Sequence, residues 1–261
     1  MTEAAASAVT AWLKRRIVDP RKRAQVRRTY RSARAPWLFV VRWLRLRSLW
    51  QSRPVHPHFG STYGTPVDRG YIEAFLQAHR ADIHGRVLEI GDARYTSLFG
   101  GTQVQRSDVL HRSAGNPLAT IVGDLANAPE IPSGQFDCLI VAQTLQYIYD
   151  YRSAIQTMHR ILKPDGVLLL TMPGIAHQSP AAEREAWGDY WRWTSMAAAR
   201  VFAETFGPQN VAVEGRGNVL AAVALLHGVV QEELRPSDLE FDDPEYELSI
   251  GVRAVKRVGG L

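Results

Sequence analysis

Hydrophobic and polar positions follow two alternating periods from residue 71 onward. Short apolar runs that end in glycine or an acid predict buried strands, and apolar residues three or four positions apart predict helices. The expected strands are 86–91, 102–109, 119–124, 136–143, 166–173, 210–215 and 246–257, and the expected helices are 71–80, 150–162, 195–207 and 218–234. Short apolar strands separated by helices predict an α/β fold with a mostly parallel sheet covered by helices on both faces.

Charge divides the chain into two parts. Residues 1–53 contain 14 Lys and Arg against two acids, a net charge of +12. Because the whole chain carries +5, residues 54–261 carry −7. We therefore expect a basic arm over residues 1–53 and a single acidic domain over residues 54–261.

The basic arm has the pattern of amphipathic helices. Asp19 and Pro20 are suited to begin a helix over 19–34, and Pro36 ends it. In 37–50, one helix face would hold Trp37, Leu38, Val41, Leu44 and Leu49, with Arg42, Arg45 and Arg47 on or beside the polar side. This pattern fits packing against the domain or docking to an anionic membrane surface or a partner. Nucleic acid is a weaker candidate, because no nucleic-acid-binding module accompanies the charge.

Cysteine content and hydropathy indicate the cellular setting. Cys138 is the only cysteine, which excludes an internal disulfide and fits a reducing compartment. No run of 18 apolar residues predicts a spanning helix, and the first residues lack the pattern of a secretory signal. We expect a cytoplasmic protein that can associate with a membrane through its arm. The oligomeric state is not predicted.

Polar residues follow successive strands at the sheet edge where parallel sheets bind ligands. Glu89 and Gly91 mark the end of the first strand, and Asp108 lies 19 residues beyond Glu89. An acid at this spacing is placed to accept hydrogen bonds from ribose hydroxyls. Asp124 and Leu125 follow the third strand, where a carboxylate can bind the exocyclic amine of adenine and a leucine can cover the ring.

The fourth strand ends in a similar way, with Gln143 and Leu145 as candidate cofactor contacts. Each acid alone is more often a turn residue or a helix cap, so the prediction depends on the ordered series of strand ends. Asp92 beside the first glycine favours one cofactor class, because its charge would repel the pyrophosphate of a dinucleotide. S-adenosylmethionine has no phosphate and carries a cationic sulfonium and an ammonium group, so acids along the site favour it.

The motif order VLEIGD…SDV…GDLA…FDCLIVAQTLQYI…ILKPDGVLLLTMPG…DYWRWT resembles the class I, Rossmann-like S-adenosylmethionine-dependent methyltransferases, type-11 subgroup, over roughly residues 65–257. The resemblance implies a seven-stranded sheet with an antiparallel last strand, S-adenosylmethionine as cofactor and S-adenosylhomocysteine as product. It also implies contacts from Glu89 and Gly91, from Asp108 to the ribose, from Asp124 and Leu125 to the adenine, and from Gln143 to the methionine portion. GDARYT departs from the usual GxGxG loop, which weakens any assignment within 92–95.

STYGTPVDRGYIE (61–73) resembles an element of a narrower set of these enzymes, often found in bacterial glycan synthesis near glycosyltransferases. The resemblance implies that Arg69 pairs with the cofactor carboxylate and that Tyr63 and Thr65 line the site. The alternative is an ordinary helix entry, with Asp68 as an acid in the first turn.

The acceptor pocket is expected from the loop after the fifth strand, residues 173–194. His177 is the first candidate for a general base, and Asp189 is a second candidate catalytic residue. The flat or hydrogen-bonding side chains of Tyr190, Trp191 and Arg192 suit a carbohydrate ring. The alternative interpretation is that His177 is a solvent-exposed loop residue and that DYWRWT packs the loop on the sheet, with Arg192 paired to an acid. No cluster has metal-ligand spacing, so a divalent metal has no support.

Three functions follow from these patterns. The first is O-methylation of a sugar or glycan hydroxyl, for example on the precursor of a methylated polysaccharide. In this case the basic arm, residues 1–53, would contact a membrane or a glycosyltransferase. The second is methylation of a small-molecule, secondary-metabolite acceptor. The third is a non-catalytic partner of a glycosyltransferase, which the altered first loop favours and the acids Asp108 and Asp124 oppose.

Overall fold

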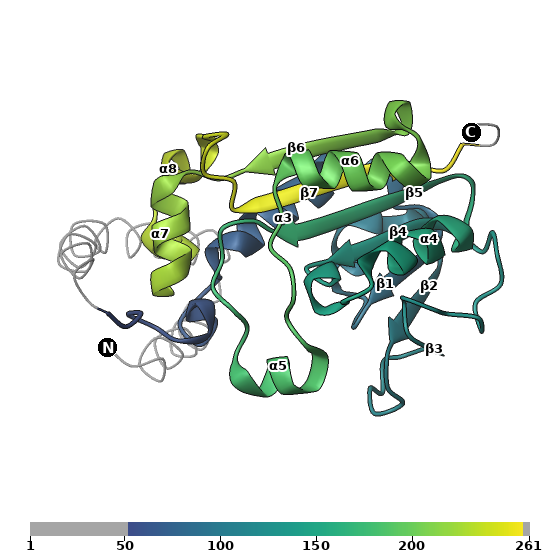
Figure 1. Cartoon of the computed structure of the whole chain (residues 1–261), viewed down its shortest axis with the longest axis horizontal. Coiled ribbons are helices and arrows are strands. Elements are labelled where there is room, and N and C mark those ends of the chain that lie inside the picture. The colour runs from purple at the N-terminus through teal and green to yellow at the C-terminus, as the bar shows by residue number, and fades with distance from the viewer. Residues whose placement is uncertain (1–51, 258–261) are drawn as a thin grey trace, which may run out of the picture.

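A computed structural model describes residues 52–257, which fold around one seven-stranded sheet (Figure 1). The helices expected at 19–34 and 37–50 lie outside the described residues, as do residues 258–261. Among residues 52–257, no helix combines the length and the apolar content needed to cross a bilayer.

The sheet has the strand order β3-β2-β1-β4-β5-β7-β6. Its strands are β1 (Gly85–Ile90), β2 (Val104–His111), β3 (Ile121–Val122), β4 (Phe136–Ala142), β5 (Leu162–Pro173), β6 (Val211–Arg216) and β7 (Ser249–Val255). β7 runs antiparallel to both β5 and β6, and the other pairs are parallel. The structure confirms the predicted Rossmann-like sheet, including its antiparallel last strand.

Helices cover both faces of the sheet (Figure 1). They are α3 (Val67–Ala78), α4 (Tyr151–Ile161), α5 (Ala181–Trp187), α6 (Ser195–Phe206), α7 (Val219–His227) and α8 (Pro236–Glu240). α4 and α6 bury their apolar faces against one side of the sheet, and α3 packs on the other side through Ile72, Phe75 and Leu76. The side chains of Asp150, Thr194 and Asn218 accept a backbone N–H at the starts of α4, α6 and α7.

The structure shortens one expected helix and adds two short ones. The helix expected over 218–234 ends at His227, because Gly228 takes a left-handed conformation (φ 70°) that terminates a helix. The short helices α5 and α8 interrupt segments that the sequence pattern left irregular. In Figure 1, α5 lies at the tip of a long excursion between β5 and α6.

Candidate functional site

A cavity of about 440 Å³ lies at the carboxyl ends of β1, β2 and β4. Its wall includes residues of four strand ends, among them Ile90, Gly91, Leu110, His111, Arg112, Gly123, Asp124, Leu125, Gln143 and Thr144, together with Tyr147, Tyr149, Asp150, Trp187 and Tyr190 at its outer side. This volume is within the range of small-molecule sites, and the position is the one where parallel α/β sheets bind ligands.

Gly91 gives the cavity an open backbone surface at the end of β1. Its N–H donates to the Leu110 carbonyl at 3.0 Å, and its own carbonyl accepts from Asn116 Nδ2 at 2.6 Å. The residue has φ 88°, and a Cβ atom built there would meet no atom within 4 Å. A ligand can therefore approach the main chain at this point, which is the usual role of a glycine after β1.

Asp124 and Leu125 line the cavity, and their contact with an adenine stays a prediction. Leu125 is buried and belongs to the main core, whereas the Asp124 side chain is half-exposed. The Asp124 carboxylate accepts from the Ala126 N–H at 2.9 Å and lies 3.6 Å from Arg112 Nε. A carboxylate held at an apolar wall can accept from an exocyclic amine, as predicted for adenine.

Gln143 lies where β4 ends, in a left-handed backbone conformation with φ 47°. Its N–H donates to the Thr171 carbonyl at 2.9 Å, and its carbonyl accepts from Gln146 Nε2 at 2.8 Å. A non-glycine residue in this conformation is strained, and such strain is concentrated at functional sites. The location of Gln143 agrees with the prediction, and its contact with a cofactor stays a prediction.

Glu89 and Leu145 do not lie where the sequence places them. Glu89 is buried, and its carboxylate accepts from the N–H groups of Tyr95 and Thr96 at 2.9 and 2.8 Å and from Thr96 Oγ1 at 2.8 Å. Burial raises the pKa of Glu89, and these hydrogen bonds only partly oppose that rise. Leu145 is fully buried in the core. Glu89 therefore holds the turn after β1 through buried hydrogen bonds. Asp92 is exposed, accepts from the Arg94 N–H and does not line the cavity.

Asp108 is also misplaced by the sequence prediction. Its side chain is 1% exposed and bonds to Arg86 Nε at 2.7 Å, Arg106 Nε at 3.0 Å and Thr120 Oγ1 at 3.1 Å. Burial alone would raise the pKa of Asp108, but the hydrogen bonds from both arginines and the threonine outweigh it and lower the pKa. This carboxylate is thus satisfied inside the protein and does not line the cavity, so the structure gives its predicted ribose contact no support.

His111 and Arg112 occupy the position for which Asp108 was predicted. β2 continues three residues beyond Asp108, so these two residues stand at its end and line the cavity. The His111 Nδ1 lies 2.9 Å from the Ser113 carbonyl, and its ring meets Trp187 edge-on at 5.4 Å. In the sequence, the only sign that β2 extends to His111 is that the apolar residues Val109 and Leu110 follow Asp108.

The segment before α3 makes contacts within the protein. The N–H and Oγ1 of Thr65 donate to the Glu232 carboxylate, at 3.0 and 2.7 Å, and Tyr63 is exposed and stacks on His56. Arg69 donates a hydrogen bond to the hydroxyl of Tyr95, in the loop after β1. None of these three predicted cofactor contacts lines the cavity, although Arg69 supports the loop next to it.

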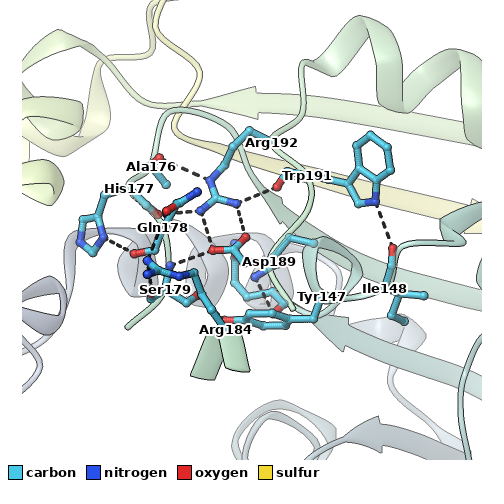
Figure 2. Close-up of polar contacts among 12 residues, drawn as sticks. Tyr147, Ile148, Ala176, His177, Gln178, Ser179, Arg184, Asp189, Trp191 and Arg192 are labelled. Carbon is cyan, nitrogen blue, oxygen red and sulfur yellow. Dashed lines mark hydrogen bonds and ion pairs between the residues drawn. The ribbon is translucent and has the colours of Figure 1, made fainter. Parts of the chain in front are cut away.

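Asp189 and Arg192 close the base of the loop between β5 and α6 (Figure 2). The Asp189 side chain is completely buried and accepts from both terminal nitrogens of Arg192, at 2.6 and 3.0 Å, and from the Ser179 N–H at 2.8 Å. Arg192 Nη2 also donates to the His177 carbonyl at 2.7 Å. Asp189 is therefore a structural residue and not a catalytic one, as the alternative interpretation of DYWRWT expects.

The other predicted acceptor residues separate into two groups. Tyr190 lines the cavity, half-exposed, and meets the exposed Tyr149 ring edge-on at 5.3 Å. Trp191 instead donates from Nε1 to the Ile148 carbonyl at 3.1 Å and packs against the core. His177 stacks on Phe59 with ring centroids 3.7 Å apart, outside the cavity wall. Within residues 52–257, no group of three or more His, Cys, Asp and Glu side chains could hold a metal ion.

Comparison with known proteins identifies the central segment. Residues 87–170 match the family model described as "Methyltransferase domain". The match runs from β1 into β5 and contains the strand ends that line the cavity. No curated protein matches the chain in sequence. Residues 87–170 of the chain thus carry a methyltransferase domain.

Solved structures with a similar arrangement share little sequence with this chain. A SAM dependent methyltransferase from Archaeoglobus fulgidus is 11% identical with a TM-score of 0.48, over 72% of this chain and 94% of that chain. A putative sarcosine dimethylglycine methyltransferase from Galdieria sulphuraria is 14% identical with a TM-score of 0.48, over 75% and 91% of the two chains. The YcgJ protein of Bacillus subtilis is 15% identical with a TM-score of 0.43, over 73% and 100%.

The cavity fits S-adenosylmethionine. Gly91 leaves open space where the main chain can be approached, Leu125 offers an apolar wall, and Asp124 offers a carboxylate beside it. The loop after β1 lacks the glycines that a pyrophosphate needs, yet it is well formed, because the Glu89 carboxylate accepts from the N–H groups of Tyr95 and Thr96. The altered loop is therefore a different solution to the same turn and not a decayed one.

Replacing Asp124 with alanine should weaken S-adenosylhomocysteine binding by roughly ten- to a hundredfold, the range expected for a lost hydrogen bond to a charged group. Because the side chain is half-exposed, stability should change little. Calorimetric titration measures the affinity. Glu204→Ala, which removes a surface acid paired with Arg152 on another helix, is the control. Equal affinities of Asp124→Ala and the wild type would contradict the adenine assignment.

Proposed function

We propose that this enzyme transfers the methyl group of S-adenosylmethionine to a hydroxyl of a sugar or glycan. The observation that supports this acceptor is the aromatic rim of the cavity, formed by Tyr147, Tyr149, Trp187 and Tyr190. Tyr149 and Tyr190 are 70% and 51% exposed at its mouth. Exposed flat rings with hydroxyl groups can stack on a sugar ring and bond to its hydroxyls.

The rim is held at the carboxyl end of β4 by bonds to the loop that follows β5. The Tyr147 hydroxyl lies 3.0 Å from Ser179 Oγ, and the Tyr190 N–H donates to the Gln146 carbonyl at 2.8 Å. Both Ser179 and Tyr190 flank the buried Asp189–Arg192 pair. These bonds connect Tyr147 and Tyr190 of the aromatic rim across the two loops, which supports a role of the rim in orienting an acceptor.

The bound cofactor supplies an electrophilic methyl group on a sulfonium. The protein contributes position, because a displacement needs the nucleophile, the methyl carbon and the sulfur in line. A sugar hydroxyl also needs a base, and Asp150 is a carboxylate on the cavity wall beside Tyr149. Hydrogen bonds from Ser153 lower the pKa of Asp150, so this carboxylate can orient a hydroxyl as a hydrogen-bond acceptor but is a weak proton acceptor. His177 stays a candidate base from the sequence, although it lies outside the cavity wall.

Removing the Tyr190 ring tests the sugar acceptor. Tyr190→Ala should raise KM for a sugar acceptor by about tenfold, the value of a lost aromatic contact of about 1.4 kcal/mol, with the affinity for S-adenosylhomocysteine unchanged. Tyr190→Phe, which keeps the ring, should retain most of the binding. The measurement is S-adenosylhomocysteine release with a panel of mono- and oligosaccharides.

A small aromatic molecule is the second candidate acceptor, because the same exposed rings would stack on it. Methyl transfer to phenols or amines, with none to any sugar in the panel, would favour this acceptor over the sugar. S-adenosylmethionine binding without transfer to either class would leave the third hypothesis, a cofactor-binding partner protein.

A further inference from the structure

Helix α7 presents an apolar face to solvent. Its sequence, VLAAVALLH, contains one polar residue, and its inner face packs on α3 through Ala221, Ala222, Ala224 and Leu225. Val219 and Leu226 are 52% and 39% exposed, and Val223 between them is half-buried. Because positions i, i+4 and i+7 lie on one side of a helix, these three residues form a continuous strip, the α7 strip.

An acidic segment contacts helix α7. Residues 231–247 contain eight acids and one arginine, a net charge of −7, which equals the net charge of the whole domain from residue 54 onward. α8 lies in this segment and contacts α7, and Leu239 packs against the α7 cluster (Figure 1). Glu240 and Glu245 are exposed. A helix with an exposed apolar strip and an acidic neighbouring segment attracts a cationic amphipathic segment and repels an anionic lipid surface.

The described chain begins next to α7. The His56 N–H donates to the His227 carbonyl at 3.0 Å, at the carboxyl end of the helix (Figure 1). Residue 50 is six positions earlier, so it lies within about 20 Å of this point. α7 is about 14 Å long at 1.5 Å per residue. A segment ending at residue 50 can therefore reach every part of the α7 strip, and the short tether gives it a high effective concentration there.

From these observations we infer that residues 37–50, WLFVVRWLRLRSLW, dock on the α7 strip. The apolar positions Leu38, Val41 and Leu44 cover the strip, and the arginines of the segment face the acids of residues 231–247. The docked segment then supports α7 and, through α7, the amino-terminal end of α3, where Arg69 bonds to the loop after β1. This inference does not depend on the acceptor or on the proposed function.

Limited trypsin digestion of the full chain tests the docking. Cleavage after Arg42, Arg45 and Arg47 should be slow in the wild type. The double substitution Val219→Gln/Leu226→Gln should accelerate it by at least about tenfold, the factor equivalent to about 1.4 kcal/mol. Met196→Gln, which changes a more exposed apolar residue on α6, is the matched control and should leave the rate unchanged. Equal cleavage rates in the wild type and the double variant would overturn the inference.

Further variants and measurements test both sides of the contact and identify the occupant of the α7 strip. Leu38→Ser changes the other side of the contact and should give the same acceleration, which keeps the test valid if the α7 variant folds poorly. Added salt should accelerate cleavage of the wild type by screening the attraction between the arginines and the acids. The double substitution Glu240→Gln/Glu245→Gln should make this acceleration smaller. A dimer that dissociates in the α7 variant would assign the strip to a second copy. Binding to phosphatidylglycerol vesicles that is lost in that variant would assign it to a membrane. Either result would overturn docking of residues 37–50.

Discussion

Replacing Asp189 with alanine is expected to destabilise the protein by about 3–5 kcal/mol, the cost of removing one partner from a buried ion pair. Arg192 would remain with its guanidinium bonded only to the carbonyls of the loop, and Ser179 would lose its N–H acceptor. The loop between β5 and α6 contains Tyr190 and contacts Tyr147 through Ser179. Because this loop would lose its closing ion pair, methyl transfer should fall along with stability. Denaturant unfolding and turnover measure the two effects.

Two variants show whether burial of the pair is the reason. Glu204→Ala removes the carboxylate of an exposed pair with Arg152, and it should cost no more than about 1 kcal/mol. Asp189→Asn keeps the shape and one oxygen acceptor, so it should lose less stability than Asp189→Ala. Similar unfolding free energies for Asp189→Ala and Glu204→Ala would contradict a structural role for the buried pair.

The same pair predicts a pH dependence of stability. Burial alone would raise the pKa of Asp189, but the hydrogen bonds from Arg192 and Ser179 outweigh it and hold the pKa below its ordinary value of 3.8. Because the folded pKa is the lower one, the contribution is complete above the unfolded value and is lost as the pH falls through the folded value. Asp189→Ala should therefore lose stability at neutral pH and approach the wild type in acid below about pH 4.

Most of the fold could be predicted because its signals are local. The apolar run FDCLIVAQ predicts β4, and the spacing of Ile155, Met158 and Ile161 predicts α4 within one residue at each end. Gly228 ends the helix that the apolar run VLAAVALLHGVV predicts to continue, because the following valines keep the apolar pattern while the glycine takes a left-handed conformation. α5 was missed because none of its residues is buried, so it leaves no periodic pattern.

The sequence predicts correctly which strand ends line the cavity, but it does not predict correctly which acid at each strand end lies on the cavity wall. Gly91, Asp124, Leu125 and Gln143 line the cavity, whereas Asp108 lies three residues short of the end of its strand. The partner that captures Asp108, Arg86, is 22 residues away on the neighbouring strand. Which side chains pair across two strands depends on the register of the strands. A sequence indicates register only through the alternation of apolar and polar residues. The same limit applies to Glu89, whose partners lie in a turn that no motif describes.

Replacing Gly91 with alanine should abolish most cofactor binding. The added Cβ would occupy the open space beside the end of β1, and alanine at φ 88° is strained by about 1–2 kcal/mol. We expect the affinity for S-adenosylhomocysteine to fall by at least about tenfold, equivalent to about 1.4 kcal/mol, in addition to a lower unfolding free energy. Calorimetric titration and denaturant unfolding separate the two effects.

Gly101 provides the matched control. It also has a positive φ, 55°, and a Cβ built there also meets no atom within 4 Å, but it lies outside the cavity wall. Gly101→Ala should therefore lose stability through backbone strain and keep the cofactor affinity of the folded protein. If both variants lost affinity equally, strain in the segment between β1 and β2 would explain the loss, and the open space at Gly91 would not be the cofactor site. A loss confined to Gly91→Ala would place the cofactor against this main-chain turn, in which one glycine and the buried Glu89 take the place of a glycine-rich loop.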